Sequence, residues 1–231
     1  MAGRSEETLA EERKWQRAEG VRLREAIEPA ERRGWDQLIE SHLVQGLILP
    51  EATTVGFCWP YKSEFDARSL VSGWAEAGVR LALPRVQAKC QPLIFNEWYP
   101  QCRMTVGTYG IPVPEGTPEL VPDLILIPVN GFDPAGYRLG YGGGYFDRTL
   151  AAIHPPPVAV GVGYELLRLQ ALTLQPFDLP MDFVVTEAGL HARMAGALQK
   201  VSPEESAPIL SALLARRELP RPQAANPIDS A

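Results

Sequence analysis

The chain has little of what would build a disulfide-rich, zinc-bound or membrane-embedded protein. It has three cysteines, Cys58, Cys90 and Cys102, and their spacing argues against a disulfide framework or a zinc site. No uninterrupted apolar run is long enough to span a bilayer, so we expect no membrane partner. The charged N-terminal residues lack the apolar stretch of a secretory signal, and we expect a cytoplasmic location.

Excess positive charge is also missing. The formal net charge of the 231 residues is −6, which gives no general attraction to nucleic acid or to anionic membranes. The three histidines, His42, His154 and His191, stand in unrelated contexts and indicate no Ser/His/Asp or Cys/His catalytic arrangement. We expect small-molecule substrates and no nucleic-acid partner, and we expect a monomer.

The chain does have apolar strands that alternate with helical segments. Strands are expected at 53–59, 79–83, 93–98, 124–129, 158–164 and 183–186, of which the last should complete the sheet. Helices are expected at 9–27, 29–50, 65–77 and 144–153. This alternation predicts an α/β fold, a three-layer sandwich with a mostly parallel sheet and helices on both faces.

Composition divides the chain into one domain and two flanking segments. Residues 1–12 are acidic and polar, which predicts a flexible N-terminus. Residues 13–201 have the length and apolar content of a single α/β domain. Residues 202–231 are rich in Pro and Ala, which predicts a partly disordered tail with one helix near 209–217.

The most informative segment is the glycine-rich loop after the strand at 124–129. Five glycines lie within residues 136–144, and Asp133, Arg138, Asp147 and Arg148 bracket them. Glycines after a strand let backbone N–H groups face a ligand, which together with Arg and Asp suits a nucleotide phosphate and a divalent ion. A simple tight turn is the alternative, because the loop matches neither the Walker pattern nor the dinucleotide fingerprint.

Other candidates stand near strand ends, where α/β sheets bind ligands. Trp59 and Glu64 stand at and after the end of the first strand, and both could contact a ligand. The alternative for Trp59 is an aromatic lid on the core, and the alternative for Glu64 is a cap of the following helix. Asp147 and Asp178 could bind Mg²⁺, or could complement a helix dipole and form a turn, respectively. Basic residues near the N-terminus share a helix face, which is either solvated or directed at a ligand.

Several of these segments resemble the 5-formyltetrahydrofolate cyclo-ligase family. The resemblance extends over residues 13–187, and its glycine-loop block is the most specific part. In chain order the matching blocks are 64–66 (EFD), 83–86 (LPRV), 109–112 (YGIP), 131–133 (GFD), 136–148 (GYRLGYGGGYFDR), 178–182 (DLPMD) and 184–187 (VVTE).

The resemblance implies an ATP-dependent ring closure with Mg²⁺ as cofactor and ATP as co-substrate. It converts 5-formyltetrahydrofolate to 5,10-methenyltetrahydrofolate, with phosphorylation of the formyl oxygen, attack by N10, and release of ADP and phosphate. The alternative is a non-catalytic folate-binding or regulatory protein on the same fold. Asp147 and Asp178 argue against that alternative, because folate binding alone needs no magnesium. A sugar-phosphate or acyl-group enzyme would need a catalytic Glu or Lys near the loop, and none is evident.

The resemblance also implies roles residue by residue. Arg138 and Tyr145 would be catalytic, and Asp147 and Asp178 would bind the metal. The folate would contact Trp59, Glu64, Tyr141, Gly142, Gly143, Gly144 and Tyr145. ATP would contact Arg13, Lys14, Arg17, Arg138, Leu139, Gly140, Tyr141, Gly142, Gly143, Gly144, Tyr145 and Phe146.

The chain departs from the family pattern at three positions. Phe146 stands where a second Tyr is common, so a hydroxyl there is dispensable. Gly143 replaces a Lys of some members, which removes one positive charge facing the phosphates. Gln16 stands where Leu is usual, so a register of the N-terminal motif that uses Lys14 is an alternative to one that begins at Arg13.

Overall fold

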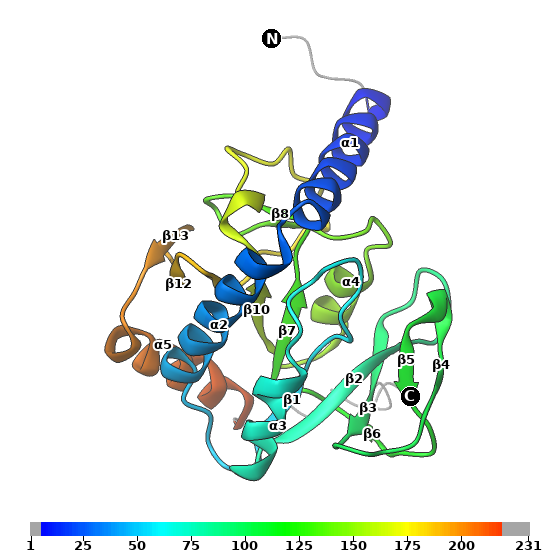
Figure 1. The fold of residues 1–231 in the computed structure, drawn as a ribbon, viewed down its shortest axis with the longest axis vertical. Helices are drawn as coiled ribbons and strands as arrows, with labels where there is room; N and C mark the ends of the chain where they lie inside the picture. Colours follow the sequence, from blue (N-terminus) through cyan, green and yellow to red (C-terminus); the bar gives the residue numbers. More distant parts are fainter. Residues whose placement is uncertain (1–5, 219–231) are drawn as a thin grey trace, which may run out of the picture.

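The computed structural model describes residues 6–218 and is built around a nine-stranded sheet (Figure 1). The strand order is β13-β12-β11-β10-β7-β1-β2-β3-β6. The bounds are β1 Thr54–Gly56, β2 Arg80–Val86, β3 Leu93–Trp98, β6 Glu119–Leu120, β7 Leu124–Pro128, β10 Val158–Val162, β11 Phe183–Thr186, β12 Gly189–Met194 and β13 Ala197–Lys200.

The five central strands, β2, β1, β7, β10 and β11, run parallel, and antiparallel strands complete both edges. Val55 of β1 pairs with Leu81 of β2 on one side and with Leu124 of β7 on the other. Strands β7 and β10 are apolar along their whole length because both faces of the sheet are covered there. Their carboxyl ends lie together, which makes that edge the place for a ligand.

Helices cover both faces of the sheet (Figure 1), as the alternating pattern predicted. They are α1 Glu6–Glu25, α2 Pro29–Gly46, α3 Arg68–Glu76, α4 Tyr145–Ala152 and α5 Pro203–Glu218. Helices α2 and α5 pack together, and the Ser206 hydroxyl donates a hydrogen bond of 2.7 Å to the carbonyl oxygen of Gly46. A Cβ at Gly46 would lie 2.4 Å from Leu190 Cδ2, so only glycine lets α2 approach β12 this closely.

Smaller elements surround the carboxyl edge of the sheet. Strands β4 (Met104–Val106) and β5 (Pro112–Pro114) form a hairpin whose tip is the short helix η1 (Thr108–Gly110). Strands β8 (Gly131–Phe132) and β9 (Arg138–Leu139) form a second hairpin that leads into the glycine loop. The short helix η2 (Glu165–Leu167) follows β10.

The sheet extends further than the sequence indicated. We expected the strand at 183–186 to be the last, and this was wrong, because β12 and β13 continue the sheet as an antiparallel hairpin. The polar side chains of His191, Arg193, Gln199 and Lys200 break up the apolar signal of these two strands. An edge hairpin that is partly exposed needs no continuous apolar run.

The flanking segments are more helical than their composition suggested. Residues 6–12, expected to be flexible, form the first turns of α1, which is rich in the good helix formers Ala, Glu and Arg. The helix expected near 209–217 begins earlier, at Pro203. Residues 1–5 and 219–231 lie outside the described residues, and the proposed domain limits stay predictions.

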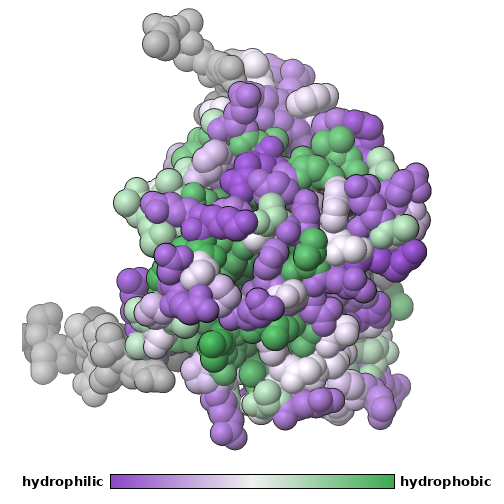
Figure 2. All heavy atoms as spheres, turned by 60° about the vertical axis from the view of Figure 1, so that its left-hand side comes forward, coloured by the Kyte–Doolittle hydropathy of each residue, from purple (hydrophilic) through white to green (hydrophobic). Residues whose placement is uncertain are grey.

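Figure 2 shows a face on which hydrophilic side chains predominate and apolar ones form scattered patches. Among residues 6–218, none of the helices combines the length and apolar character that a bilayer crossing requires.

Candidate functional site

A cavity of about 500 Å³ lies at the carboxyl ends of β1, β2 and β7. Its walls come from α1, the loop after β1, the tip of the β4–β5 hairpin, the glycine loop and the segment 175–178. Of the site residues that the sequence predicts, all except Lys14 and Leu139 line this cavity. The tertiary structure therefore brings the two ends of the proposed site, for nucleotide and for folate, into one continuous space.

Lys14 and Leu139 lie elsewhere. Lys14 is exposed and does not line the cavity, since it is one residue, about 100° of helical rotation, past Arg13. Of the two registers of the N-terminal motif, only the one that begins at Arg13 has its first residue in the cavity wall. Leu139 is fully buried in β9, and its carbonyl oxygen accepts the Asn130 N–H at 2.8 Å. Its side chain supports the loop from the core.

The glycine loop needs glycine at two positions for different reasons. Gly142 has φ +93°, and a Cβ there would lie 3.3 Å from the Arg17 guanidinium carbon. Gly144 has φ +63° and is the residue from which α4 begins, while Arg148 donates to the carbonyl oxygen of Gly143 at 2.6 Å. The loop backbone therefore turns tightly beside Arg17 and directs the N-terminal end of α4 toward the cavity.

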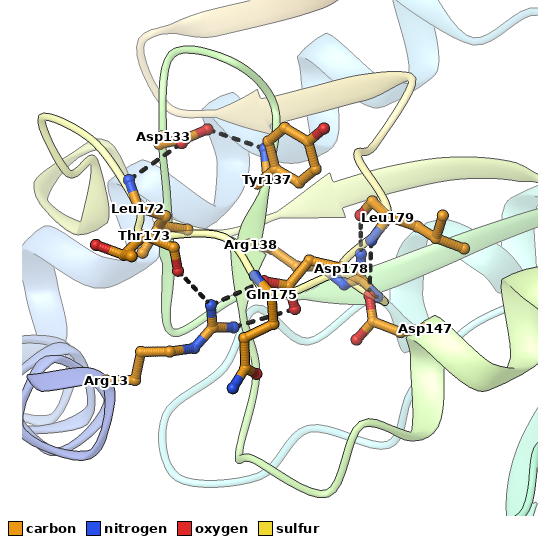
Figure 3. A network of polar contacts seen from close by, with 10 residues as sticks. All are labelled: Arg13, Asp133, Tyr137, Arg138, Asp147, Leu172, Thr173, Gln175, Asp178 and Leu179. Carbon is orange, nitrogen blue, oxygen red and sulfur yellow. Dashed lines mark hydrogen bonds and ion pairs between the residues drawn. The ribbon is translucent and has the colours of Figure 1, made fainter. Parts of the chain in front are cut away.

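Asp133 holds the segment that leads into this loop. Its buried carboxylate accepts the backbone N–H groups of Tyr137 and Leu172 at 2.9 and 3.2 Å (Figure 3). It also accepts the Ala135 N–H at 3.0 Å. It thereby joins the turn before Arg138 to the segment that follows η2. Asp133 was part of a matching block, but sequence reasoning gave it no role, and an Asp followed by Gly three residues later is a turn signal that could have indicated one.

Arg138 lies between two carboxylates of the site (Figure 3). It donates to Asp147 Oδ1 at 3.0 Å and to the Leu179 carbonyl oxygen at 2.8 Å. Burial lowers the pKa of Arg138, and the charges of Asp147 and Asp178 oppose that shift. Asp147 Oδ1 also accepts the Leu179 N–H at 3.1 Å, so α4 and the segment 178–179 are held together here.

Arg13 makes the corresponding contact from α1. Its guanidinium donates to both carboxylate oxygens of Asp178, at 2.8 and 3.2 Å, and to the Thr173 carbonyl oxygen at 2.9 Å (Figure 3). Arg17, one turn further along, also lines the cavity, and burial and the nearby charge of Arg13 lower its pKa. The basic face of α1 is therefore directed at the cavity, and the interpretation as a solvated face is wrong for these two arginines.

Glu64 is a buried carboxylate at the other end of the cavity. Its Oε1 accepts the Tyr141 hydroxyl at 2.9 Å, and its Oε2 accepts the Tyr61 N–H at 3.0 Å. Burial raises the pKa of Glu64, while Arg24 and the two hydrogen bonds oppose the shift. Glu64 does not cap the following helix, because Asp66 accepts the N–H of Arg68 at the start of α3.

Aromatic side chains complete the walls. Trp59 lines the cavity, and its ring lies under the Arg68 guanidinium at 4.5 Å. Tyr145 and Tyr109, the latter from the β4–β5 hairpin, have their hydroxyl oxygens 3.2 Å apart. That hydrogen bond raises the pKa of Tyr145. Phe146 lines the cavity without a hydroxyl, as its sequence position indicated.

Sequence reasoning gave no specific role to Arg24, which lies on α1 outside the cavity lining. It is buried and donates to the Tyr141 hydroxyl at 2.8 Å. Arg13, Arg17 and Arg24 are four and seven residues apart, which places all three on one side of a helix. This spacing could have indicated that Arg24 belongs to the same face.

These features define a class of protein. The parallel sheet, the glycine loop and the arginines around one cavity define an α/β protein with a candidate site whose chemistry suits an anionic ligand. The chain belongs to the 5-formyltetrahydrofolate cyclo-ligase family, whose profile matches residues 10–187. The resemblance that the sequence blocks indicated is thereby confirmed.

Individual relatives agree with this assignment. Two proteins named 5-formyltetrahydrofolate cyclo-ligase are similar to the chain. That of Escherichia coli K12 is 27% identical over 170 residues, which cover 71% of this chain and 93% of the relative. That of Mycolicibacterium smegmatis is 31% identical over 176 residues, which cover 71% and 87%.

Solved structures agree as well. The NMR structure of Aquifex aeolicus 5,10-methenyltetrahydrofolate synthetase matches with a TM-score of 0.67 and 28% identity, over 82% of this chain and 96% of that one. A Mycoplasma pneumoniae 5,10-methenyltetrahydrofolate synthetase matches with a TM-score of 0.63 and 23% identity, over 76% and 98%. The second likeness concerns the fold alone.

Proposed function

We propose that this protein catalyses the ATP-dependent cyclisation of 5-formyltetrahydrofolate to 5,10-methenyltetrahydrofolate, with release of ADP and phosphate. The observation that carries the proposal is the single cavity that joins an arginine-rich glycine loop at one end to the buried Glu64 carboxylate at the other. Such a cavity holds a polyphosphate and a hydrogen-bonding ring system side by side. The names of the relatives point to the same reaction.

The arginine-rich end suits the ATP phosphates. Arg13, Arg17 and Arg138 line the cavity, and the glycine loop adds backbone N–H groups without Cβ atoms in the way. In phosphoryl transfer the protein mainly positions the reactants and neutralises charge. Bound phosphate would compete with Asp178 for the Arg13 guanidinium, because both face the same cavity.

Asp147 and Asp178 are the proposed ligands for Mg²⁺. Both line the cavity, and no hydrogen bond to Asp147 Oδ2 is found within residues 6–218, so that oxygen is available. Asp178 shares its oxygens with Arg13 and with the N–H of Gln175, and would bind a cation with its remaining lone pairs. The described residues contain no group of three or more His, Cys, Asp or Glu side chains that could hold a metal ion. Two carboxylates fit Mg²⁺, which takes its other ligands from phosphate and water and would offset the phosphate charge.

The other end suits the folate ring. The Glu64 carboxylate can accept two N–H groups of the amino-pyrimidinone edge at once, in addition to the hydrogen bonds it already accepts. Trp59 supplies an aromatic wall beside it. The distance between the two ends of the cavity would then determine where the formyl group meets the γ-phosphate.

The chemistry needs one activated oxygen and one internal nucleophile. The formyl oxygen attacks the γ-phosphorus of ATP, and the bond to the bridging oxygen breaks to release ADP. N10 then attacks the formyl carbon and loses its proton, and the carbon–oxygen bond breaks to release phosphate. Arg138 would stabilise the transferring phosphoryl group, and the Tyr145 hydroxyl would contact the formyl region. Holding the formyl oxygen, the γ-phosphate and N10 close together in the correct orientation is the main task of the protein.

The test is direct. Purified protein is incubated with 5-formyltetrahydrofolate, ATP and Mg²⁺, while the near-ultraviolet absorbance of the methenyl product and the release of ADP are followed. We expect both signals to rise together. Folate that binds without either signal would instead support the non-catalytic folate-binding alternative. The cytoplasmic location and the monomeric state stay predictions of the sequence.

A further inference from the structure

Arg24 is a buried arginine, 1% exposed, whose guanidinium contacts three different segments of the chain. Its Nε donates to the Lys62 carbonyl oxygen at 2.9 Å. Its Nη1 donates to the Val129 carbonyl oxygen at 3.2 Å and to Asn130 Oδ1 at 2.9 Å. Its Nη2 donates to the Tyr141 hydroxyl at 2.8 Å. One guanidinium from α1 thus joins the loop after β1, the end of β7 and the glycine loop.

The Tyr141 hydroxyl extends this network to the folate end of the cavity. It accepts from Arg24 and donates to Glu64 Oε1 at 2.9 Å, which leaves Arg24 Nη2 3.8 Å from that oxygen. Glu64 Oε2 is held separately by the Tyr61 N–H. Both carboxylate oxygens therefore have fixed directions before any ligand arrives.

The charge of Arg24 matters because Glu64 is buried. Burial favours the protonated form and raises the pKa of Glu64, and the first group that opposes this is Arg24, followed by the Tyr141 hydroxyl. The neighbouring Cys58 thiol stays neutral and adds no negative charge beside Glu64, because burial and Glu64 raise its pKa well above the ordinary value. An arginine is suited to this position because it keeps its charge when buried and serves several acceptors at once.

We propose that Arg24 is a positioning residue, which acts through the Tyr141 hydroxyl to hold the Glu64 carboxylate in the orientation that binds the folate. Arg24 does not line the cavity, so it touches neither substrate. This inference rests on the proposed function, in which Glu64 binds the folate.

The experiment compares Arg24→Met and Tyr141→Phe with a matched control on the same helix. Arg22→Met is the control, because Arg22 is exposed and its guanidinium bonds only to Glu19 among the described residues. Calorimetry measures the binding of 5-formyltetrahydrofolate and, separately, of a non-hydrolysable ATP analogue with Mg²⁺. Tyr141→Phe keeps the ring and three of the four Arg24 contacts, so it tests the network even where Arg24→Met does not fold.

We expect each of the two variants to weaken folate binding by roughly ten- to hundredfold, the usual effect of losing a hydrogen bond that supports a charged group. Binding of the ATP analogue by Arg24→Met should change by less than about threefold, because Arg24 does not line the cavity, and Arg22→Met should change neither affinity. The variant that combines Arg24→Met and Tyr141→Phe should bind folate no more weakly than whichever single variant has the lower folate affinity, because both changes break one network. Arg24→Lys should recover part of the folate affinity.

Three results would overturn the inference. Folate binding that is unchanged in Tyr141→Phe removes the hydroxyl from the network. Equal losses of folate and nucleotide binding in Arg24→Met would indicate that Arg24 only stabilises the fold. Fully additive losses would show that Arg24 and Tyr141 act separately. A wild-type protein that binds no folate would instead overturn the proposed function, so failure of the proposed function can be distinguished from failure of the role of Arg24.

Discussion

Replacing Asp133 tests how the glycine loop is held in place. Its carboxylate accepts three backbone N–H groups in a buried position, from Ala135, Tyr137 and Leu172. Hydrogen bonds to a charged group contribute about 1.5–3 kcal/mol each. In Asp133→Asn one amide oxygen can still accept from Ala135 and Tyr137, while the NH₂ group would meet the Leu172 N–H, so we expect a loss of about 2 kcal/mol in the free energy of unfolding.

Asp133→Ala removes both acceptor oxygens and leaves three backbone N–H donors without their partner, so we expect a larger loss of about 4 kcal/mol. Urea denaturation followed by circular dichroism measures both values. Asp66→Asn is the control, because Asp66 is partly exposed, pairs with Arg68, and can still accept the Arg68 N–H as an amide. The reasoning fails if Asp133→Asn lowers the free energy of unfolding no more than Asp66→Asn does. It also fails if Asp133→Asn and Asp133→Ala lower that free energy equally.

Three further predictions concern ligand binding. Asp147→Asn should weaken Mg²⁺–ATP binding more than folate binding, and unchanged nucleotide affinity in calorimetry would count against a metal-binding role. Gly142→Ala should weaken nucleotide binding, because a Cβ would press on Arg17 at 3.3 Å and φ is +93°; Gly116→Ala, with φ +73° and open space, should lose only stability. Folate affinity should fall as the pH drops through the pKa of Glu64, which burial raises above the ordinary value of about 4.3, because the protonated carboxyl group accepts fewer N–H bonds. Glu64→Gln should remove this pH dependence. A wild-type protein whose folate affinity does not change with pH would refute the prediction.

Much of the fold could be predicted from local patterns. The strands at 93–98 and 183–186 match β3 and β11 at both ends, and β7 and β10 lie within their predicted ranges. These are apolar runs between turn-forming residues, a signal that depends only on neighbours in the chain. The hairpin of β12 and β13 carries polar side chains at an edge, and its pairing with β11 has no such local signal.

The candidate site was predictable for a different reason. The glycine loop carries its information in residue types, since Gly142 and Gly144 stand where φ is positive and Arg138 and Asp147 flank them. The long-range partners of the charged residues in and around the site were not predictable. Asp133 bonds to Leu172, Arg13 to Asp178 and Arg24 to Tyr141, across 39, 165 and 117 positions of the chain.

The sequence by itself determined the fold class, the family and the residue types of the glycine loop, because each depends on composition and on short-range order. Only the tertiary structure decided which residues of α1 face the cavity. It showed Arg13 and Arg17 in the cavity wall and Lys14 outside it, and it placed Arg24 behind Glu64. The physical reason is that burial and hydrogen-bond partners depend on how distant segments pack, and helical spacing alone does not determine which face of a helix meets the sheet.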